Sequence, residues 1–165
     1  MQKVNYLWGN WHNVAFICIA ILIVFADQLS KTWIRANLPY GHSLFNVGFF
    51  QITHAQNTGA AFGLFQGQSF ILTVIAFAGA VAVLLFVFLS RRYLPSLDSM
   101  VGKSVLGLVL GGIVGNLIDR LRLGYITDFI DFRFWPAFNI ADSAITVSVI
   151  IFAYLLIRQT VDEKH

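Results

Sequence analysis

Long apolar stretches alternate with short polar ones along most of this 165-residue chain. Four of them approach the roughly 20 residues that an α-helix needs to cross a bilayer, and they cover approximately residues 13–37, 69–89, 104–121 and 139–158. The pattern therefore predicts a mainly α, polytopic membrane protein with four transmembrane helices. At this length we expect one domain over residues 1–165.

The segment between the first two spans, residues 38–68, has a different character. It is rich in aromatic and β-branched residues, and turn-forming motifs stand at 39–41 and 57–59, which favours short strands joined by turns. The segment is too apolar for a free loop. It is also too irregular to cross lipid, where every backbone polar group needs an internal partner. We expect a small β-segment lying at the membrane interface.

The composition agrees with a membrane location. The chain is 58% hydrophobic and only 12% charged, whereas soluble domains carry about 25% charged residues. The net charge of +3 is too small and too scattered for nucleic-acid binding. It suits basic side chains that meet anionic head groups, so we expect membrane lipids as partners and no nucleic acid.

Four spans place both termini on the same side of the membrane. Six of the eleven Lys and Arg residues lie on that side, three of them (Arg91, Arg92 and Lys103) close to the loop between the second and third spans. The excess predicts both termini in the cytoplasm. The first stretch could instead be a cleaved signal peptide, with Val24–Ala26 as its cleavage site. A retained span is favoured because only Lys3 precedes it and an amphipathic continuation follows it.

Acidic residues gather at the ends of the apolar stretches. A carboxylate at the edge of lipid is costly, so its position indicates a functional site by default. Five of the chain's eight acidic residues are placed in this way: Asp27, Asp119, Asp128, Asp131 and Asp142.

Asp128 and Asp142 form the most informative pair. Residues 127–134 alternate as a strand would, which places Asp128 in an apolar face and Asp131 on the opposite one. A carboxyl group there needs a partner, and Asp142 could supply it after the turn near Pro136. Two carboxylates that share a proton can perform acid and base chemistry together. The pair indicates an aspartyl hydrolase embedded in a membrane.

Asp142 also has a purely structural interpretation. If Asn139 caps the fourth helix, Asp142 is its third residue, where a carboxylate accepts hydrogen bonds from free amides and favours the helix dipole. The sequence leaves both interpretations open.

The third span carries small residues at every fourth position, which lets a helix approach its neighbours closely. Continued by four residues, this stripe of small residues reaches Asp119. The neighbouring stripe on the same helix carries Asn116 and Arg120, so the polar end of the helix should face the interior of the bundle. Asp119 and Arg120 could simply anchor the helix end; alternatively, Asn116 and Arg120 contact a substrate backbone. The stripe consists of Gly107, Gly111 and Gly115.

The remaining polar positions indicate structural roles rather than a second catalytic or metal site. Asp27 and Lys31, four residues apart on the first helix, are most simply an ion pair. Asn57 stands in the turn before the second span, and the lone Cys18 is a packing residue. The four histidines are scattered and no HExxH motif occurs. We therefore expect neither a metal nor another cofactor.

Five blocks of the sequence, taken together, resemble the bacterial lipoprotein signal peptidases, also called type II signal peptidases. They follow one another in the order typical of that family and extend over essentially the whole chain, although the stretch 133–136 is short. No position within the blocks departs from the family's pattern. The blocks are Asp27-Gln-Leu-Ser-Lys31, Asn57-Thr-Gly-Ala-Ala-Phe62, Gly111-Gly-Ile-Val-Gly-Asn-Leu-Ile-Asp-Arg120, Thr127-Asp-Phe-Ile-Asp-Phe132 and Phe138-Asn-Ile-Ala-Asp-Ser143.

The resemblance implies an aspartyl endopeptidase of the bacterial cytoplasmic (inner) membrane, with its active site near the outer face. It implies Asp128 and Asp142 as the catalytic pair and a prolipoprotein as substrate, cut just before a cysteine that carries a diacylglyceryl group. The interfacial β-segment would hold this substrate, and we expect the enzyme to be a monomer. The residues implied to surround the pair are Asp27, Lys31, Asn57, Gly59, Asn116, Asp119, Arg120, Asn139 and Ala141.

Two other classes of protein are compatible with the same residues. In a small transporter or proton-conducting protein, the aspartates and Arg120 would form a relay. In a structural subunit, they would only pack the helices together.

Overall fold

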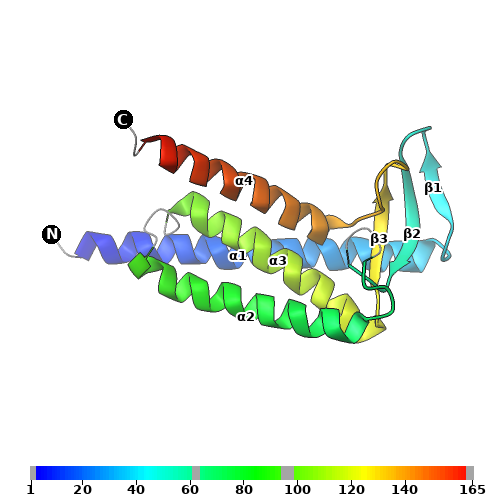
Figure 1. Ribbon diagram of the computed structural model, residues 1–165, viewed down its shortest axis with the longest axis horizontal. Helices are drawn as coiled ribbons and strands as arrows, with labels where there is room; N and C mark the ends of the chain where they lie inside the picture. The colour runs from blue at the N-terminus through cyan, green and yellow to red at the C-terminus, as the bar shows by residue number, and fades with distance from the viewer. Residues whose placement is uncertain (1–2, 61–63, 94–98, 163–165) are drawn as a thin grey trace.

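The computed structural model describes residues 3–60, 64–93 and 99–162. Within these ranges the helices run side by side along the long axis, both ends of the chain lie at one end of the bundle, and a small sheet covers the other end (Figure 1). The elements are α1 (Lys3–Asn37), β1 (Ser43–Asn46), β2 (Gln51–Asn57), α2 (Ser69–Tyr93), α3 (Met100–Leu123), β3 (Ile126–Asp131) and α4 (Ile140–Asp162).

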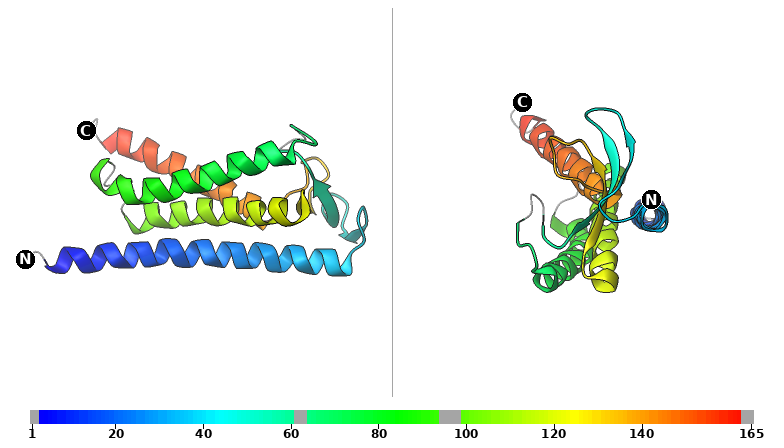
Figure 2. Two further views of the ribbon diagram at one scale, coloured as in Figure 1. Left: turned by 90° about the horizontal axis from the view of Figure 1, so that it is seen from below. Right: turned by 90° about the vertical axis from the view of Figure 1, so that its right-hand side faces the viewer.

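Helix α3 is the centre of the bundle and contacts α1, α2 and α4 (Figures 1 and 2). Its glycines allow the close approach to α1. A Cβ atom on Gly111 would lie 2.7 Å from Ile23 Cβ, and one on Gly107 would lie 2.8 Å from the Phe16 carbonyl oxygen. The prediction that the glycine stripe faces the interior is confirmed.

The ends of α3 are defined by local signals. The Ser99 hydroxyl accepts a hydrogen bond from the Gly102 N–H at the start, as expected of an N-cap. At the other end, Gly124 has a left-handed φ of 80° and its N–H donates to the Arg120 carbonyl oxygen. This turn sends the chain directly into β3, which brings the polar end of α3 next to the sheet.

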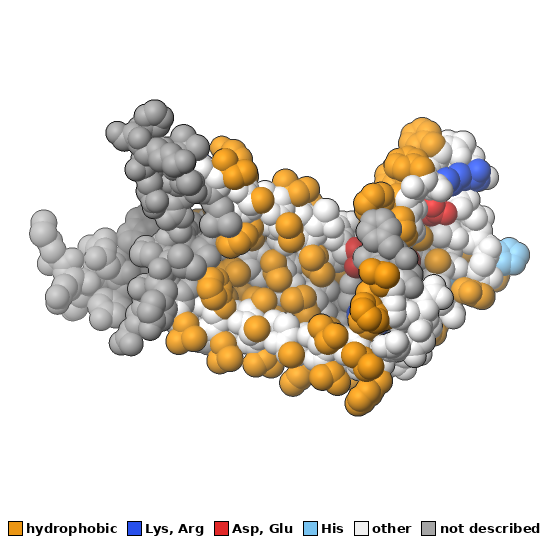
Figure 3. Space-filling model, in the orientation of Figure 1, with side chains coloured by type: hydrophobic (Ala, Val, Ile, Leu, Met, Phe, Trp, Pro, Cys, Tyr) orange, Lys and Arg blue, Asp and Glu red, His pale blue; other side chains and the backbone are white. Residues whose placement is uncertain are grey.

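The outward faces of the helices are apolar (Figure 3), as a lipid-facing surface requires. Phe25 of α1 and Phe70 of α2 are 65% and 80% exposed. Three helices contain stretches long and apolar enough to cross a membrane: Trp11–Asn37, Ser69–Val87 and Met100–Leu123. The predicted fourth span falls on α4, whose described apolar stretch, Ile140–Leu155, is shorter.

Two predictions about the ends of the helices need correction. Helix α1 begins at Lys3 rather than near Asn13, so the polar residues before the first apolar stretch are helical too. Lys103, which we placed among basic residues near head groups, is fully buried against α2, and its Nζ donates to the Val87 carbonyl oxygen at 3.1 Å. It belongs to the packing of the bundle.

The three strands form one antiparallel sheet in the order β1-β2-β3. The predicted β-segment is confirmed, but its pairing with β3 was not foreseen. Ala55 lies opposite Asp128 and Asn57 opposite Ile126, after an irregularity between Ile52 and Ala55. This register places Asn57 diagonally across from Asp128 on the same face.

The predicted strand over 127–134 is wrong at its C-terminal end, because β3 stops at Asp131. The Asp131 carboxylate accepts a hydrogen bond from the Arg133 N–H at 2.7 Å, and Arg133 has a φ of 61°. An aspartate side chain that bonds to the backbone two residues further on forms a turn. The chain therefore leaves the sheet before Phe134.

Candidate active site

Asp128 and Asp142 line the same cavity, of about 900 Å³, at the sheet end of the bundle. Apolar side chains of α2 and α4, such as Leu72 and Ile145, form one part of its wall, and Trp135 closes another. Figure 3 shows the molecule hollowed between the helices and the sheet, with acidic side-chain atoms visible inside. A polar site with apolar walls is typical of a pocket that binds an organic ligand.

Asp128 is held by two side-chain amides. Asn57 Nδ2 donates to its Oδ2 at 3.1 Å and Asn139 Nδ2 to its Oδ1 at 2.7 Å. The Asn57 amide is oriented in turn, because its Oδ1 accepts a hydrogen bond from the Gly59 N–H at 2.9 Å. The carboxyl group is only 2% exposed, so both oxygens meet fixed donors in a buried place.

Asp142 lies in the first turn of α4, where it forms a capping box with Asn139. The Asn139 N–H donates to Asp142 Oδ2 at 3.2 Å, and the Asp142 N–H donates to Asn139 Oδ1 at 2.9 Å. Asn116 Nδ2 donates to the other carboxylate oxygen at 2.8 Å. The helix-cap interpretation of Asp142 is thus confirmed, and it coexists with a place in the cavity.

Asn139 brings the two aspartates together. One side-chain amide contacts both: its oxygen accepts the Asp142 N–H and its nitrogen donates to Asp128. The predicted convergence of the two aspartates on one site is confirmed.

The environment of Asp128 favours its protonated form. Burial, and next to it the nearby Asp142 charge, raise the pKa of this carboxyl group to about 7. The hydrogen bonds from Asn57 and Asn139 and the charge of Lys31 act in the opposite direction. Desolvation outweighs them.

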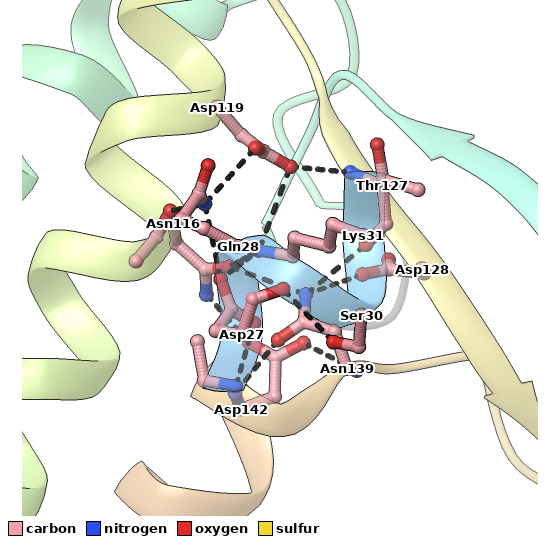
Figure 4. A network of polar contacts seen from close by, with 12 residues as sticks. Asp27, Gln28, Ser30, Lys31, Asn116, Asp119, Thr127, Asp128, Asn139 and Asp142 are labelled. Atoms are coloured by element: carbon pink, nitrogen blue, oxygen red, sulfur yellow. Dashed lines mark hydrogen bonds and ion pairs between the residues drawn. The ribbon is translucent and has the colours of Figure 1, made fainter. Parts of the chain in front are cut away.

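A second layer of charges lies behind the two aspartates (Figure 4). Lys31 Nζ lies 2.8 Å from Asp27, 2.9 Å from Asn116 Oδ1 and 3.5 Å from Asp119. The predicted Asp27–Lys31 ion pair is confirmed, but it is fully buried rather than interfacial. Because an ammonium group can only donate, Lys31 also fixes which end of the Asn116 amide faces Asp142.

Each carboxylate of this layer accepts a hydrogen bond from the backbone N–H of the residue that precedes one of the cavity aspartates. Asp27 Oδ1 accepts the Ala141 N–H, and Asp119 Oδ2 accepts the Thr127 N–H, both at 3.0 Å. Ala141 is fully buried against α3: a Cβ atom on Gly112 would lie 2.6 Å from its carbonyl oxygen. A larger residue than alanine would push α4 away from α3 there.

Arg120 reaches from α3 into the cavity. One of its terminal nitrogens donates to the Gly59 carbonyl oxygen at 2.8 Å, while Nε is buried without a hydrogen-bond partner in the described part of the chain. Gly59 is held tightly, since a Cβ atom there would lie 2.6 Å from the Leu64 carbonyl oxygen. Ala61 and Phe62 of the same motif lie outside the described residues.

All nine residues predicted to surround the aspartates therefore lie at this end of the bundle. Seven of them belong to the layer or bond directly to it or to the pair, and the other two, Gly59 and Arg120, bond to each other in the cavity lining. Asn116 also lines the cavity, and its amide is hydrogen-bonded to Asp142, Lys31 and Asn139. Asp131 stands apart and binds Gln51 at 2.6 Å.

Comparisons with known proteins agree on one family. The family model for signal peptidase (SPase) II matches residues 19–158. Lipoprotein signal peptidases from Dehalococcoides mccartyi and Moorella thermoacetica are 52% and 43% identical to this chain over 127 and 143 residues. The alignments cover 77% and 86% of this chain and 79% and 92% of those relatives.

The chain belongs to the signal peptidase II family. It is therefore a protease of the aspartic type and a multi-pass membrane protein. A solved structure of a bacterial membrane enzyme superposes with a TM-score of 0.79 at 31% identity, covering 88% of each chain. The predicted family and fold class are confirmed.

Two side chains of this signal peptidase II site were not selected from its sequence. Gln28 lies within the first motif and contacts Asp27 and Asp119. Arg35 donates to the Thr127 hydroxyl at 2.9 Å and lies 3.5 Å from Asp119. The stripe of Asp27, Lys31 and Arg35, spaced by four, was a signal for Arg35. No pattern in the sequence distinguishes Gln28 from an ordinary polar residue at the end of an apolar stretch.

Proposed function

We propose that Asp128 and Asp142 perform the peptide-bond hydrolysis by which this signal peptidase II releases signal peptides from lipoprotein precursors. The observation that carries the proposal is Asn139, which binds both carboxyl groups at the wall of one cavity: its side-chain nitrogen donates to Asp128 and its backbone N–H donates to the Asp142 carboxylate. The described residues that line this cavity come from the sheet and from α2, α3 and α4 together, which supports a single domain over residues 1–165. The proposed functional unit is the monomer.

The two aspartates take different roles. Asp142 is the ionised base, because it accepts a backbone N–H at the start of α4 and an amide that Lys31 orients, and a helix N-terminus favours negative charge. Asp128 carries the proton, since burial raises its pKa to about 7. Two carboxyl groups that face one cavity share a single proton in this way.

Hydrolysis then follows the chemistry of a carboxyl pair. Asp142 takes a proton from a water molecule while the water oxygen bonds to the scissile carbonyl carbon, and Asp128 gives its proton to the carbonyl oxygen. The tetrahedral intermediate collapses when the C–N bond breaks and the leaving nitrogen receives the proton held by Asp142. The products are a carboxylic acid and an amine, and Asp128 recovers its proton from the collapsing intermediate.

Arg120 supports the reacting carbonyl group. Its guanidinium is anchored to the Gly59 carbonyl oxygen, which leaves other N–H donors for substrate oxygens inside the cavity. A fixed donor aimed at developing negative charge is among the strongest contributions to acyl-transfer catalysis.

The apolar walls of the cavity account for a lipidated substrate. Leu72 and Ile75 of α2 and Ile145 of α4 line it together with the aspartates, and these helices present apolar surfaces outward. Acyl chains of a diacylglyceryl-cysteine can therefore lie along apolar protein and lipid, where each buried CH₂ group contributes about 0.8 kcal/mol. The scissile bond just before this cysteine then meets the aspartates.

The enzyme resides in the bacterial cytoplasmic membrane, with both termini in the cytoplasm and the active site near the outer face. Two observations support this orientation: the ends of the chain and the sheet lie at opposite ends of the bundle (Figure 1), and basic residues are more numerous on the side of the termini.

Cleavage by the purified protein tests the function directly. In detergent, it should release the signal peptide from a precursor that carries a diacylglyceryl-cysteine, with the cut immediately before that residue. The same precursor without lipid is the matched control and should be cut far more slowly. Absence of any cleavage, together with proton or solute transport in vesicles, would favour the transporter alternative.

A further inference from the structure

Two buried aspartates stand behind the catalytic pair and control where that pair lies. Asp27 holds the N–H of Ala141, the residue before Asp142, and Asp119 holds the N–H of Thr127, the residue before Asp128. Each rear carboxylate is therefore coupled to one catalytic carboxyl group through a single peptide unit. The distance between the rear carboxylates bears directly on the distance between the catalytic ones.

Gln28 joins the two rear carboxylates. Its Nε2 donates to Asp27 Oδ2 and to Asp119 Oδ1, both at 3.2 Å, and lies 3.0 Å from the Gly115 carbonyl oxygen (Figure 4). All three neighbours are acceptors, so they fix the amide with its NH₂ group between the carboxylates. Gln28 thus ties α1 to α3 at the level of the active site.

We propose that Gln28 is a positioning residue of the hydrolytic reaction: by bridging Asp27 and Asp119, it sets the spacing between Asp142 and Asp128. The inference rests on the proposed function of that pair. It assigns to Gln28 a role distinct from that of Lys31, which bridges the same carboxylates unequally, at 2.8 and 3.5 Å.

The physical reason is the repulsion between two buried anions. Like charges in a poorly solvated place separate unless donors lie between them. Lys31 supplies the compensating charge, and Gln28 supplies a second bridge without adding charge. Removing its NH₂ group leaves Lys31 as the remaining bridge between the pair within the described contacts, so the rear carboxylates and the two peptide units that they hold move apart.

Gln28→Leu tests this role because it removes the donors and keeps the approximate size of the side chain. With a diacylglyceryl-modified precursor peptide, we expect kcat to fall by about 10- to 100-fold, while KM changes by no more than about twofold. The matched control is Asn37→Leu, which removes an exposed side-chain amide from the same helix, where it donates to the Trp33 carbonyl oxygen away from the carboxylates. It should leave both constants near those of the unmodified enzyme.

A charge exchange provides a second test that does not depend on how well Gln28→Leu folds. Gln28→Glu alone places three carboxylates together, and Asp119→Asn alone leaves two NH₂ groups facing each other; both should lose activity. In the double variant, the new asparagine still accepts the Thr127 N–H through its oxygen and donates to the new glutamate. Because the glutamate still faces Asp27 and the Gly115 carbonyl oxygen, recovery is partial: kcat should rise by about tenfold over Gln28→Glu, as expected for residues in direct contact.

Full kcat in Gln28→Leu, or a double variant no better than either single one, would overturn the inference. Asp128→Asn in the same assay separates this failure from a failure of the proposed function. If Asp128→Asn is inactive while Gln28→Leu is fully active, only the positioning role is wrong; if Asp128→Asn is active, the catalytic assignment itself is wrong.

Discussion

At the scale of single residues, the site depends on how amide and ammonium donors share three buried carboxyl groups and the half-buried one of Asp142. The groups do not compete, because each donor is oriented by a second contact: Asn57 by Gly59, Asn116 by Lys31, and Asn139 by Asp142. Fully satisfied networks of this kind hold side chains rigidly. The two catalytic carboxyl groups are therefore held in fixed positions.

The raised pKa of Asp128 predicts the alkaline side of the pH profile. Since Asp128 must be protonated to act as the acid, kcat/KM should fall as the pH rises through about 7. The measurement is the rate of cleavage of a lipidated precursor peptide between about pH 5 and 9. A rate that stays constant up to the upper limit would contradict this role for Asp128.

Arg120 should be irreplaceable even by lysine. Arg120→Lys keeps the charge but cannot reach Gly59 and present further N–H donors to the cavity at the same time. We expect kcat/KM to fall on the order of 100-fold, the usual effect of losing one oxyanion donor. Arg122→Lys, on an exposed side chain of the same helix end, is the control and should change little.

At the scale of elements, the contact between α1 and α3 carries the geometry of the site. A Cβ atom on Gly111 would lie 2.7 Å from Ile23, whereas one on Gly79 of α2 would have its nearest contact at 3.8 Å. Gly111→Leu should abolish cleavage by forcing these helices apart.

Replacement by alanine tests the same contact through stability. Gly111→Ala should lower the melting temperature in detergent, and the matched control Gly79→Ala should leave it unchanged or raise it. Equal effects of the two would argue against close packing at Gly111.

The elements also show where the sequence was informative. The existence of the helices, the glycine stripe and the β-segment follow from local patterns, so they could be predicted. The pairing of β2 with β3 could not, because it joins segments about 70 residues apart through a shifted register. The end of β3 was missed because alternation continues through Phe132 and Phe134, while the Asp131 side chain turns the backbone.

The candidate site, like the fold, could be predicted from the sequence only in part. Asp128 and Asp142 were selected because carboxylates at the edge of apolar stretches are rare and costly. Gln28 was not, because a neutral amide at the edge of an apolar stretch costs less than a carboxylate there. Its importance arises only when α3 places Asp119 beside it.

At the scale of the whole molecule, the site lies at the end of the bundle opposite the ends of the chain (Figure 1). Cysteine labelling tests the proposed orientation, and Cys18→Ala provides a background without other thiols. An impermeant reagent applied to whole cells should modify Ser43→Cys in β1 and should not modify Met100→Cys at the start of α3. Both positions are exposed. The reverse pattern would place the active site on the cytoplasmic side.

The central claim is that Asp128 and Asp142 together cut the peptide bond. Asp128→Asn and Asp142→Asn are nearly isosteric, and each should insert and fold. Each should lower the rate of cleavage of a lipidated precursor peptide by about 100- to 10,000-fold, the usual contribution of an acid or base. Asp131→Asn, whose carboxylate binds Gln51 and the Arg133 backbone away from the cavity, is the matched control and should remain active. If either Asp128→Asn or Asp142→Asn cleaves the precursor at close to the normal rate, the account is contradicted.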